Sequence, residues 1–399
     1  MSRRRSAVNH EVMHEINRAL VLSSLRENPS QTRAKLSSRT GLTRSAISNL
    51  ADELIQNDMI HEVGYEDSTG GRRGILLELN PEGACAIAAK INPSTIQCAL
   101  VNLTGEIDWY ESVPTDSTEE PLVLGLCQRL IQTAFALNGD ARPVLGIAVA
   151  APGLISAEGS IIYSKYMDWH NVDFRVDWEN QFGVPVSVDN EVSLSALGES
   201  RYGSATEDSH FIYMEVGHGV GAGIVIDRQL YQGKHGYAGE IGFMASYFEE
   251  NNGLGALNWQ DTVNIPYLQQ TVARLQTENG ERIAAHEYRS FEQLVGAIRV
   301  GDRLACSAFR DLGRRFAVGL ANLYHAFDIP VFILGGELGR EYGPFLADVH
   351  AEVERHLVMS PPGGIDLRIS CLQPDAALMG AFARVFDNML IEHTPYTYF

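Results

Sequence analysis

TRAKLSSRTGLTRSAISNLADEL, residues 32–54, is the stretch that decides the fold of the first part of this chain. Its spacing predicts two short helices joined by a turn. Thr32 and Thr43 each precede a helical run and can cap it, because a threonine hydroxyl accepts a hydrogen bond from a free backbone N–H of the first turn. Gly41 lies between the two runs, where it can adopt a positive φ without strain. The segment therefore predicts a helix-turn-helix.

The second of these helices has two distinct faces. Ile47, Leu50 and Leu54 recur at steps of three and four residues, which places them together on an inner face. The outer face carries short polar side chains and one arginine, which can lie in a major groove and reach base edges. The residues expected to contact DNA from this helix are Thr43, Arg44, Ser45, Ser48 and Asn49.

The residues after the second helix predict a β-hairpin with a basic tip. Met59–Gly64 and Ile75–Leu79 have the pattern of strands, and Ser68–Gly74 is a glycine-rich tip. Arg72 and Arg73 in this tip can contact phosphates or enter a minor groove, as the wing of a winged helix does. The alternative is an ordinary helical hairpin followed by a surface turn, but a wing at this distance favours DNA binding.

Composition separates a nearly neutral beginning from an acidic body. The chain has 399 residues, 45% of them hydrophobic, which suits two or three domains. Its net charge is −19, yet residues 1–80 hold 11 basic and 10 acidic side chains, so the acidic excess belongs to the remainder. An acidic body repels DNA, and we expect it to be held away from the duplex. Arg3–Arg5 is either a tail that follows phosphates or a disordered solubilising end.

The cysteines and the lack of targeting patterns indicate a reduced, cytoplasmic protein. No pair of cysteines has CxxC spacing, and each lies among apolar neighbours, so each is expected to be a small buried thiol. The sequence holds no signal peptide and no apolar run of membrane length. The cysteines are Cys85, Cys98, Cys127, Cys306 and Cys371.

From about residue 84 a pattern of strands, a helix and a further strand occurs twice. Duplicated β-β-β-α-β units whose strands end in glycine turns predict two α/β lobes with a cleft between them, where ligands bind at the strand ends. In the first repeat, strands are expected at 84–91, 96–103, 144–150 and 187–189, and helices at 121–137 and 191–201. In the second, strands are expected at 211–216, 223–227 and 331–334, and a long helix at 302–326.

Several motifs of this body occur together in one known family. They are VGHGVGAGIVI (216–226), GKHGYAGEIGFM (233–244), APGLISAEG (151–159), DNE (189–191), ALGE (196–199) and LGGE (334–337). With them the chain resembles the ROK family of repressors, open reading frames and sugar kinases, and its winged helix is similar to that of the repressor branch. The resemblance implies an α/β fold class, with an N-terminal winged helix-turn-helix followed by a two-lobed actin-like ATPase fold.

The resemblance also implies a division into domains. Residues 1–80 would form the winged helix-turn-helix DNA-binding domain, and residues 81–200 the first α/β lobe. Residues 201–399 would form the second α/β lobe, which would carry a dimerisation surface.

Two departures from the family's kinases argue against sugar phosphorylation. Those kinases begin the body with an Asp-x-Gly-Gly-Thr loop, whose glycines let backbone N–H groups approach phosphate oxygens. The matching stretch here is Lys90–Thr95 (KINPST), in which lysine replaces the aspartate and a proline removes a donor. Glu191 stands where the kinases have a catalytic aspartate, and its longer side chain misplaces a base. We therefore expect no enzymatic activity, no catalytic residue and no cofactor.

The zinc site of the family is also missing from the sequence. Phe243 stands at the position of its histidine ligand, and Glu249–Asn258, which matches its cysteine cluster, holds neither cysteine nor histidine. Zinc needs such nitrogen or thiolate ligands. No metal site is expected, and the sugar pocket that the zinc loops support in the family is expected to differ in shape.

The sugar-binding part of the family pattern is largely kept. Glu240 stands where a family carboxylate accepts hydrogen bonds from sugar hydroxyls, although it could instead serve the adjacent glycine turn. Tyr166 replaces a sugar-binding asparagine, so the preferred sugar is expected to differ from that of glucose-type relatives. Trp169 and His235 could pack on a sugar face or simply fill the core and a loop. The candidate sugar-binding residues are Asn190, Glu191, Glu240, Gln260, Trp169 and His235.

The sequence thus predicts a transcriptional regulator, and specifically a repressor of carbohydrate-utilisation genes. Its expected partners are operator DNA and a sugar or sugar-derivative inducer that releases it, with no membrane partner. A homodimer or a tetramer is expected, because two-fold operators match two-fold proteins. A sugar kinase with an added DNA-binding domain, and a regulator controlled by a protein partner, remain the alternatives.

Overall fold

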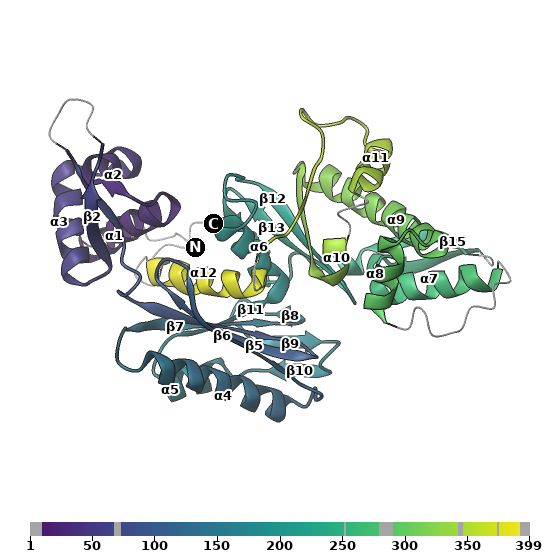
Figure 1. Cartoon of the computed structure of the whole chain (residues 1–399), viewed down its shortest axis with the longest axis horizontal. Helices are drawn as coiled ribbons and strands as arrows, with labels where there is room; N and C mark the ends of the chain where they lie inside the picture. The colour runs from purple at the N-terminus through teal and green to yellow at the C-terminus, as the bar shows by residue number, and fades with distance from the viewer. Residues whose placement is uncertain are drawn as a thin grey trace, which may run out of the picture. The chain divides into compact units, whose positions relative to one another are not determined.

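A computed structural model describes residues 10–67, 73–250, 253–278, 290–341, 346–372 and 375–391 (Figure 1). The chain divides into two compact units. The first consists of Met1–Glu191 together with Leu378–Phe399, and the second is Val192–Ala377. The last helix of the chain therefore belongs mainly to the first unit. The domain boundaries at residues 80 and 200 stay predictions.

The first unit begins with the predicted winged helix. Its three strands form an antiparallel sheet in the order β1-β3-β2, and its three helices contact one another. The sequence patterns do not predict α1 or the short β1. The elements are α1 (His10–Glu27), β1 (Gln31–Thr32), α2 (Arg33–Thr40), α3 (Arg44–Gln56), β2 (Ile60–Tyr65) and β3 (Ile75–Leu79).

The caps and the core of this domain confirm the sequence prediction. The hydroxyls of Thr32 and Thr43 accept hydrogen bonds from backbone N–H groups three residues later, at 3.3 and 3.2 Å, and so cap α2 and α3. Gly41 has a φ of 73°, a value that strains other residues. The buried residues of the two helices include Leu36, Ile47, Leu50 and Leu54.

The rest of the first unit is built on a five-stranded sheet in the order β11-β7-β4-β5-β6. The central strand β4 pairs parallel with β7 and antiparallel with β5, and β7 pairs parallel with β11. Every residue of β4 is buried, because helices α4 and α5 cover one face of the sheet and α12 the other (Figure 1). The strands are β4 (Cys85–Ile91), β5 (Thr95–Asn102), β6 (Ile107–Pro114), β7 (Val144–Ala151) and β11 (Val186–Asn190). The helices are α4 (Glu120–Asn138), α5 (Arg175–Phe182) and α12 (Ala376–Ile391).

A small antiparallel sheet, in the order β10-β9-β8, completes the first unit. Its strands are β8 (Leu154–Ile155), β9 (Ile161–Ser164) and β10 (Trp169–Val172).

The second unit repeats the topology of the first, with the strand order β18-β17-β12-β13-β14. The first strand of the repeat is again central, with antiparallel partners on one side and parallel partners on the other. This confirms the duplicated pattern read from the sequence. The strands are β12 (Phe211–Val216), β13 (Val220–Ile226), β14 (Gln229–Leu230), β17 (Val331–Gly335) and β18 (Asp366–Ile369), and β15 (Ala245–Glu250) pairs with β16 (Gly253–Asn258) as a separate hairpin.

In its described residues, the second unit also contains α-helices and two short 3₁₀ helices. They are α6 (Glu191–Tyr202), α7 (Ile265–Glu278), α8 (Phe291–Arg299), α9 (Arg303–Phe327), α10 (Gly336–Glu341) and α11 (Leu346–His356), with short 3₁₀ helices η1 (Ile241–Phe243) and η2 (Trp259–Thr262).

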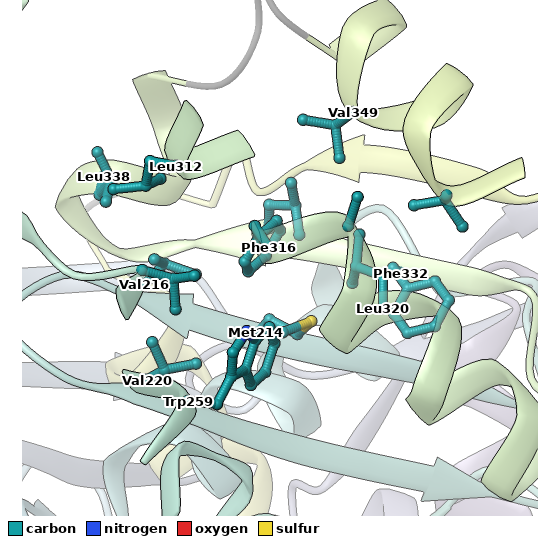
Figure 2. Close-up of a cluster of buried hydrophobic side chains, with 14 of the residues drawn as sticks. Met214, Val216, Val220, Trp259, Leu312, Phe316, Leu320, Phe332, Leu338 and Val349 are labelled. Atoms are coloured by element: carbon teal, nitrogen blue, oxygen red, sulfur yellow. The ribbon is translucent and has the colours of Figure 1, made fainter. Parts of the chain in front are cut away.

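The core of the second unit fixes the segment that carries Gln260. Trp259 stacks on Phe316 of α9 with ring centroids 5.7 Å apart, and its Nε1 donates to the Arg315 carbonyl at 3.2 Å (Figure 2). A β-carbon on Gly319 would come within 1.9 Å of the indole ring. A glycine is therefore required there if Trp259 is to pack on α9.

The cysteines only partly follow the expectation of five buried thiols. Cys85, Cys98 and Cys127 are buried, and burial raises the pKa of the Cys127 thiol to about 12. Cys306 is half-buried and Cys371 is exposed, so the expectation is wrong for these two. Cys306 lies in the first turn of α9, and Cys371 lies just beyond the edge strand β18, where apolar neighbours in sequence do not ensure cover in the fold.

None of the helices in the described part of the chain combines the length and the hydropathy that a bilayer span requires.

Candidate functional site

Helix α3 presents most of the predicted DNA-contacting side chains to solvent. Thr43, Arg44, Ser45 and Asn49 are exposed, and Ser48 is half-buried. The first turn of α3 holds no acidic residue, so the positive end of the helix dipole is not offset there. The geometry agrees with a helix that enters a groove, and the DNA contacts themselves stay a prediction.

Two acidic residues farther along α3 are paired with side chains from the neighbouring helices. Arg33 Nη2 of α2 lies 2.7 Å from Asp52 Oδ1, and His14 Nε2 of α1 lies 2.9 Å from Glu53 Oε2. Pairing of this kind reduces the repulsion that a carboxylate exerts on a DNA phosphate. The negative charge of Asp52 is thus partly compensated by Arg33 within the winged helix.

The base of the wing packs on the cap of α2. Glu66 N donates to the Gly74 carbonyl at 2.9 Å and closes the hairpin. A β-carbon on Gly74 would come within 2.6 Å of the Thr32 methyl group, so the close approach requires glycine. Arg73 is exposed beside this contact, whereas Arg72 lies outside the described residues.

The turn that stands in place of a kinase phosphate loop is closed by its own hydrogen bonds. Asn92 Oδ1 accepts from Ser94 N at 3.2 Å, and the Asn92 carbonyl accepts from Thr95 N at 3.3 Å. Asn92 N donates to the Thr95 carbonyl at 3.0 Å, and Pro93 has no N–H. The backbone donors of residues 92–95 are therefore used within the turn, and the turn is not arranged to hold a nucleotide phosphate.

The two residues that replace kinase aspartates face each other. Lys90 is buried at the end of β4, and its Nζ lies 3.8 Å from Glu191 Oε2. The two side chains are 9% and 20% exposed. An ammonium group repels a divalent cation, so Lys90 disfavours binding of the metal ion that accompanies a nucleotide.

Asn190 and Asp189, at the end of β11, are held by different partners. Asn190 Nδ2 donates to the Gly153 carbonyl at 2.9 Å. Gly153 has a φ of 109°, and a β-carbon there would come within 2.3 Å of the Tyr163 carbonyl oxygen, so the turn requires glycine. Asp189 Oδ2 lies 2.9 Å from Arg384 Nε of α12. The end of β11 is thus fixed on both sides within the first unit.

The Glu240 carboxyl is partly buried and has no internal partner among the described residues. The preceding Gly239 has a φ of 95° and accepts a hydrogen bond from Ala222 N at 2.8 Å, which fixes the turn on β13. Burial raises the pKa of the Glu240 carboxyl. The Glu240 side chain makes no hydrogen bond that caps η1, so the structure gives it no role in stabilising the adjacent turn. A carboxylate in this state is suited to accept hydrogen bonds from hydroxyl groups of a ligand.

Gln260 lies against the same turn. A β-carbon on Gly242 would come within 2.8 Å of Gln260 Oε1 and 2.4 Å of the Val220 carbonyl oxygen. Gly242 is part of η1, which directly follows Glu240, and η1 contacts η2. The structure therefore brings Gln260, which is buried, to the turn that Glu240 begins.

The aromatic candidates have different environments. His235 is exposed, with its ring 6.1 Å from that of Tyr237. Trp169 is 3% exposed in the apolar core of the first unit, and its Nε1 donates to the Thr118 carbonyl at 2.8 Å. Trp169 is thus a core residue in this structure, because its ring is covered by apolar side chains and its N–H is used. Tyr166 is exposed.

No cluster of three or more His, Cys, Asp or Glu side chains that could hold a metal ion occurs within the described ranges. Phe243, at the position of the family's histidine ligand, is exposed and offers no ligand atom.

Sequence patterns do not single out Arg384, which lies 195 residues from its partner Asp189. Only the composition of α12 could have drawn attention to Arg384, because Arg384 and Asp387 are the two charged residues of this otherwise mainly apolar helix.

Comparisons with known sequences place these features in context. The profile of the ROK family matches residues 87–387. A curated relative, the xylose repressor of Caldicellulosiruptor bescii, is 28% identical over 397 residues, which cover 96% of this chain and 98% of the relative.

Comparisons with solved structures agree on the fold. A ROK family transcriptional regulator, described as a homologue of the E. coli MLC protein, has a TM-score of 0.81 at 22% identity, covering 96% of this chain and 99% of that one. A ROK family glucokinase from Streptomyces griseus, solved with glucose and AMPPNP, has a TM-score of 0.63 at 25% identity, covering 75% of this chain and 98% of that one.

Proposed function

Because the chain belongs to the ROK family, we propose that it is a sugar-responsive transcriptional repressor. One observation carries this conclusion: a winged helix with an exposed α3 is joined to a body whose phosphate loop is replaced by the closed turn at Asn92. The xylose repressor that aligns over nearly the whole chain supports the same function.

DNA binding is assigned to the winged helix. Helix α3 enters the major groove, where Ser45, Ser48 and Asn49 reach base edges and Arg44 reaches bases or phosphates. Arg72 and Arg73 contact phosphates from the wing. A homodimer presents two such domains to a near-palindromic operator, because one recognition helix reads only a few base pairs.

Sugar phosphorylation is not part of the proposed function. The likeness to a glucokinase covers 75% of this chain, but the side chains of this chain at the turn in place of the phosphate loop do not suit a nucleotide and its metal ion. The turn at Asn92 uses its own backbone donors, and Lys90 carries a positive charge where the kinases have a carboxylate.

The effector is a sugar or a sugar derivative. Glu240 accepts hydrogen bonds from sugar hydroxyls, since its carboxyl lacks an internal partner in the described part of the chain. Gln260 lies against the turn that Glu240 begins. Asn190, Glu191 and His235 are the further residues proposed to contact the sugar. Trp169 is left out because it is buried in the core. The name of the relative makes D-xylose the first effector to test.

Thermal melting of the purified protein tests this assignment. A ligand that binds only the folded state raises the Tm by mass action. The panel holds D-xylose, other pentoses, hexoses, amino sugars and their phosphates, each with and without ATP–magnesium. A sugar-specific shift that ATP does not change supports the proposal, whereas an ATP-dependent shift supports a kinase. Glu240→Gln should reduce the shift at a given sugar concentration, and Glu158→Gln, which alters an exposed carboxylate on another turn, should keep it.

A further inference from the structure

Four charged side chains of alternating sign connect the end of β11 to the winged helix within the first unit. Asp189 lies beside Arg384, with 2.9 Å between Oδ2 and Nε. Asp387 accepts a hydrogen bond from Arg26 of α1 at 2.7 Å, from Nη1 to Oδ1. Arg384 and Asp387 are three residues apart on α12, a spacing that places them side by side on a helix surface. The order of charges is therefore Asp189, Arg384, Asp387 and Arg26.

These contacts are more buried than ordinary surface pairs. The side chains of Arg26 and Asp387 are 7% and 16% exposed, and those of Arg384 and Asp189 are 19% and 15% exposed. The Arg26 guanidinium also lies over the Phe386 ring, 4.5 Å from its centroid, which adds a cation–π contact. A partly buried pair holds its geometry more firmly than an exposed one, because separating it leaves a charge with little water around it.

The position of these pairs along the chain gives them a role beyond packing. The chain passes from the first unit to the second between Glu191 and Val192, and it returns between Ala377 and Leu378. Asp189 lies two residues before the first passage, and α12 begins at the second. The ion pair between Asp189 and Arg384 thus ties the strand that leaves the first unit to the helix that re-enters it.

The same strand end carries two of the proposed effector contacts. Asn190 and Glu191 directly follow Asp189, so a ligand that binds their side chains affects the position of the end of β11. At the other end of this series of four charged side chains, Arg26 lies in the last turn of α1, and α1 contacts both α2 and α3. A shift of α12 therefore has a direct route to the DNA-binding helices.

We propose that α12 transmits effector occupancy from the end of β11 to the winged helix, with Arg384 and Arg26 as its positioning residues. This inference rests on the proposed function. A bound sugar favours one arrangement of the end of β11. Through its ion pair with Asp189, Arg384 moves α12 with β11, and the contact between Asp387 of α12 and Arg26 of α1 changes as a result. Coupling of this kind needs only that the sugar binds the two arrangements with different affinity.

Charge reversal across one contact tests this route in the full-length protein. The variants are Arg26→Asp, Asp387→Arg and the double variant that restores the pair with its signs exchanged. Asp387→Asn is a milder variant that keeps the test valid if a reversal impairs folding. Arg18→Gln is the matched control, since Arg18 lies on the same helix but pairs with Glu15 of α1 rather than with α12.

Two quantities are measured for each variant: the Tm shift produced by D-xylose, and the Kd for a duplex that the wild type selects from a random-sequence pool, with and without D-xylose. In the wild type and Arg18→Gln, D-xylose should raise the Kd about tenfold or more, within the usual range of coupling between sites. In the single variants that ratio should fall below about twofold while the Tm shift persists, and the double variant should recover most of it.

The outcomes separate this inference from the function on which it rests. A full Kd response to D-xylose in Arg26→Asp, Asp387→Arg and Asp387→Asn would overturn the route through α12 and leave the repressor function intact. A wild type that selects no duplex, or whose duplex binding is changed neither by D-xylose nor by any other sugar of the panel, would contradict both.

Discussion

Lys90 Nζ lies 3.8 Å from Glu191 Oε2, although each of the two positions carries an aspartate in the kinases that the sequence resembles. The lysine at position 90 and the glutamate at position 191 each make the other favourable. A buried ammonium is costly unless a carboxylate lies near it, and the longer glutamate side chain extends toward the lysine. The two departures from the kinase pattern therefore lie together in the structure as a pair of opposite charges, where the resemblance implies two like charges that suit a metal–nucleotide complex.

Removing both members of this pair should destabilise the protein less than the sum of the two single removals. Lys90→Met and Glu191→Gln are each expected to lower the free energy of unfolding by about 1–3 kcal/mol, because each removes the opposite charge 3.8 Å from a partly buried side chain. The double variant should cost less than the sum of the two. Urea denaturation without sugar measures all three, and strictly additive losses would show that the two side chains do not interact.

Phosphoryl transfer should be absent, and a single reversion should not create it. We expect no sugar-dependent ADP formation from the wild type with magnesium and ATP. Lys90→Asp should behave in the same way, because the backbone donors of the Asn92 turn remain engaged. A coupled assay with D-xylose and glucose measures this, and turnover that depends on the sugar would contradict the assignment.

Glu240→Gln should stabilise the free protein and weaken sugar binding. Burial raises the pKa of this carboxyl, so the folded state holds its proton to a higher pH than the unfolded state does. The contribution of Glu240 to stability is thus fully present below its ordinary pKa and is lost as the pH rises through the raised value. The variant, which cannot ionise, should have a higher Tm than the wild type at pH 7, and the difference should shrink toward pH 4.

The same variant should lose about tenfold or more in sugar affinity, because hydrogen bonds to a charged acceptor are worth about 1.5–3 kcal/mol. Melting curves at pH 4 and pH 7, together with calorimetric titration of D-xylose, measure the two effects. A Tm difference that does not change with pH would argue that the carboxyl is well solvated. Undiminished binding would remove Glu240 from the effector site.

Arg72→Ala combined with Arg73→Ala should weaken binding to all duplexes alike. Each phosphate contact contributes about one to the slope of log K against log salt, so the slope should fall by about two. Fluorescence anisotropy with a selected and a random duplex, at several salt concentrations, measures this. Arg129→Ala, which changes an exposed arginine of α4, is the control. An unchanged slope would exclude the wing from phosphate contact.

The elements that the sequence predicts well are those set by local chemistry. Thr32, Gly41 and Thr43 mark the ends of α2 and α3 because caps and positive φ depend on neighbouring residues alone. The duplicated sheet follows equally from buried apolar runs. Helix α1 was not predicted, since its hydrophobic pattern is weak and its stability comes from contacts with α2 and β3.

Contacts between distant residues are what sequence reasoning could not supply. Nothing near Asp189 indicates Arg384, and nothing near Lys90 indicates that Glu191 lies opposite. Trp169 was a candidate sugar contact because aromatic rings suit sugar faces, yet its burial depends on strands that form from other segments. Gln260 lies against the turn that Glu240 begins because Gly242 permits a close approach that a one-dimensional pattern does not show.

The most direct test of the central claim is the binding of the purified protein to a duplex that it selects from a random-sequence pool, titrated with D-xylose and then with the other sugars of the panel. A sugar-responsive repressor should bind that duplex at least about a thousandfold more tightly than random DNA and should release it when one sugar is added. Equal affinity for selected and random DNA, or tight binding that no sugar of the panel alters, would contradict the account.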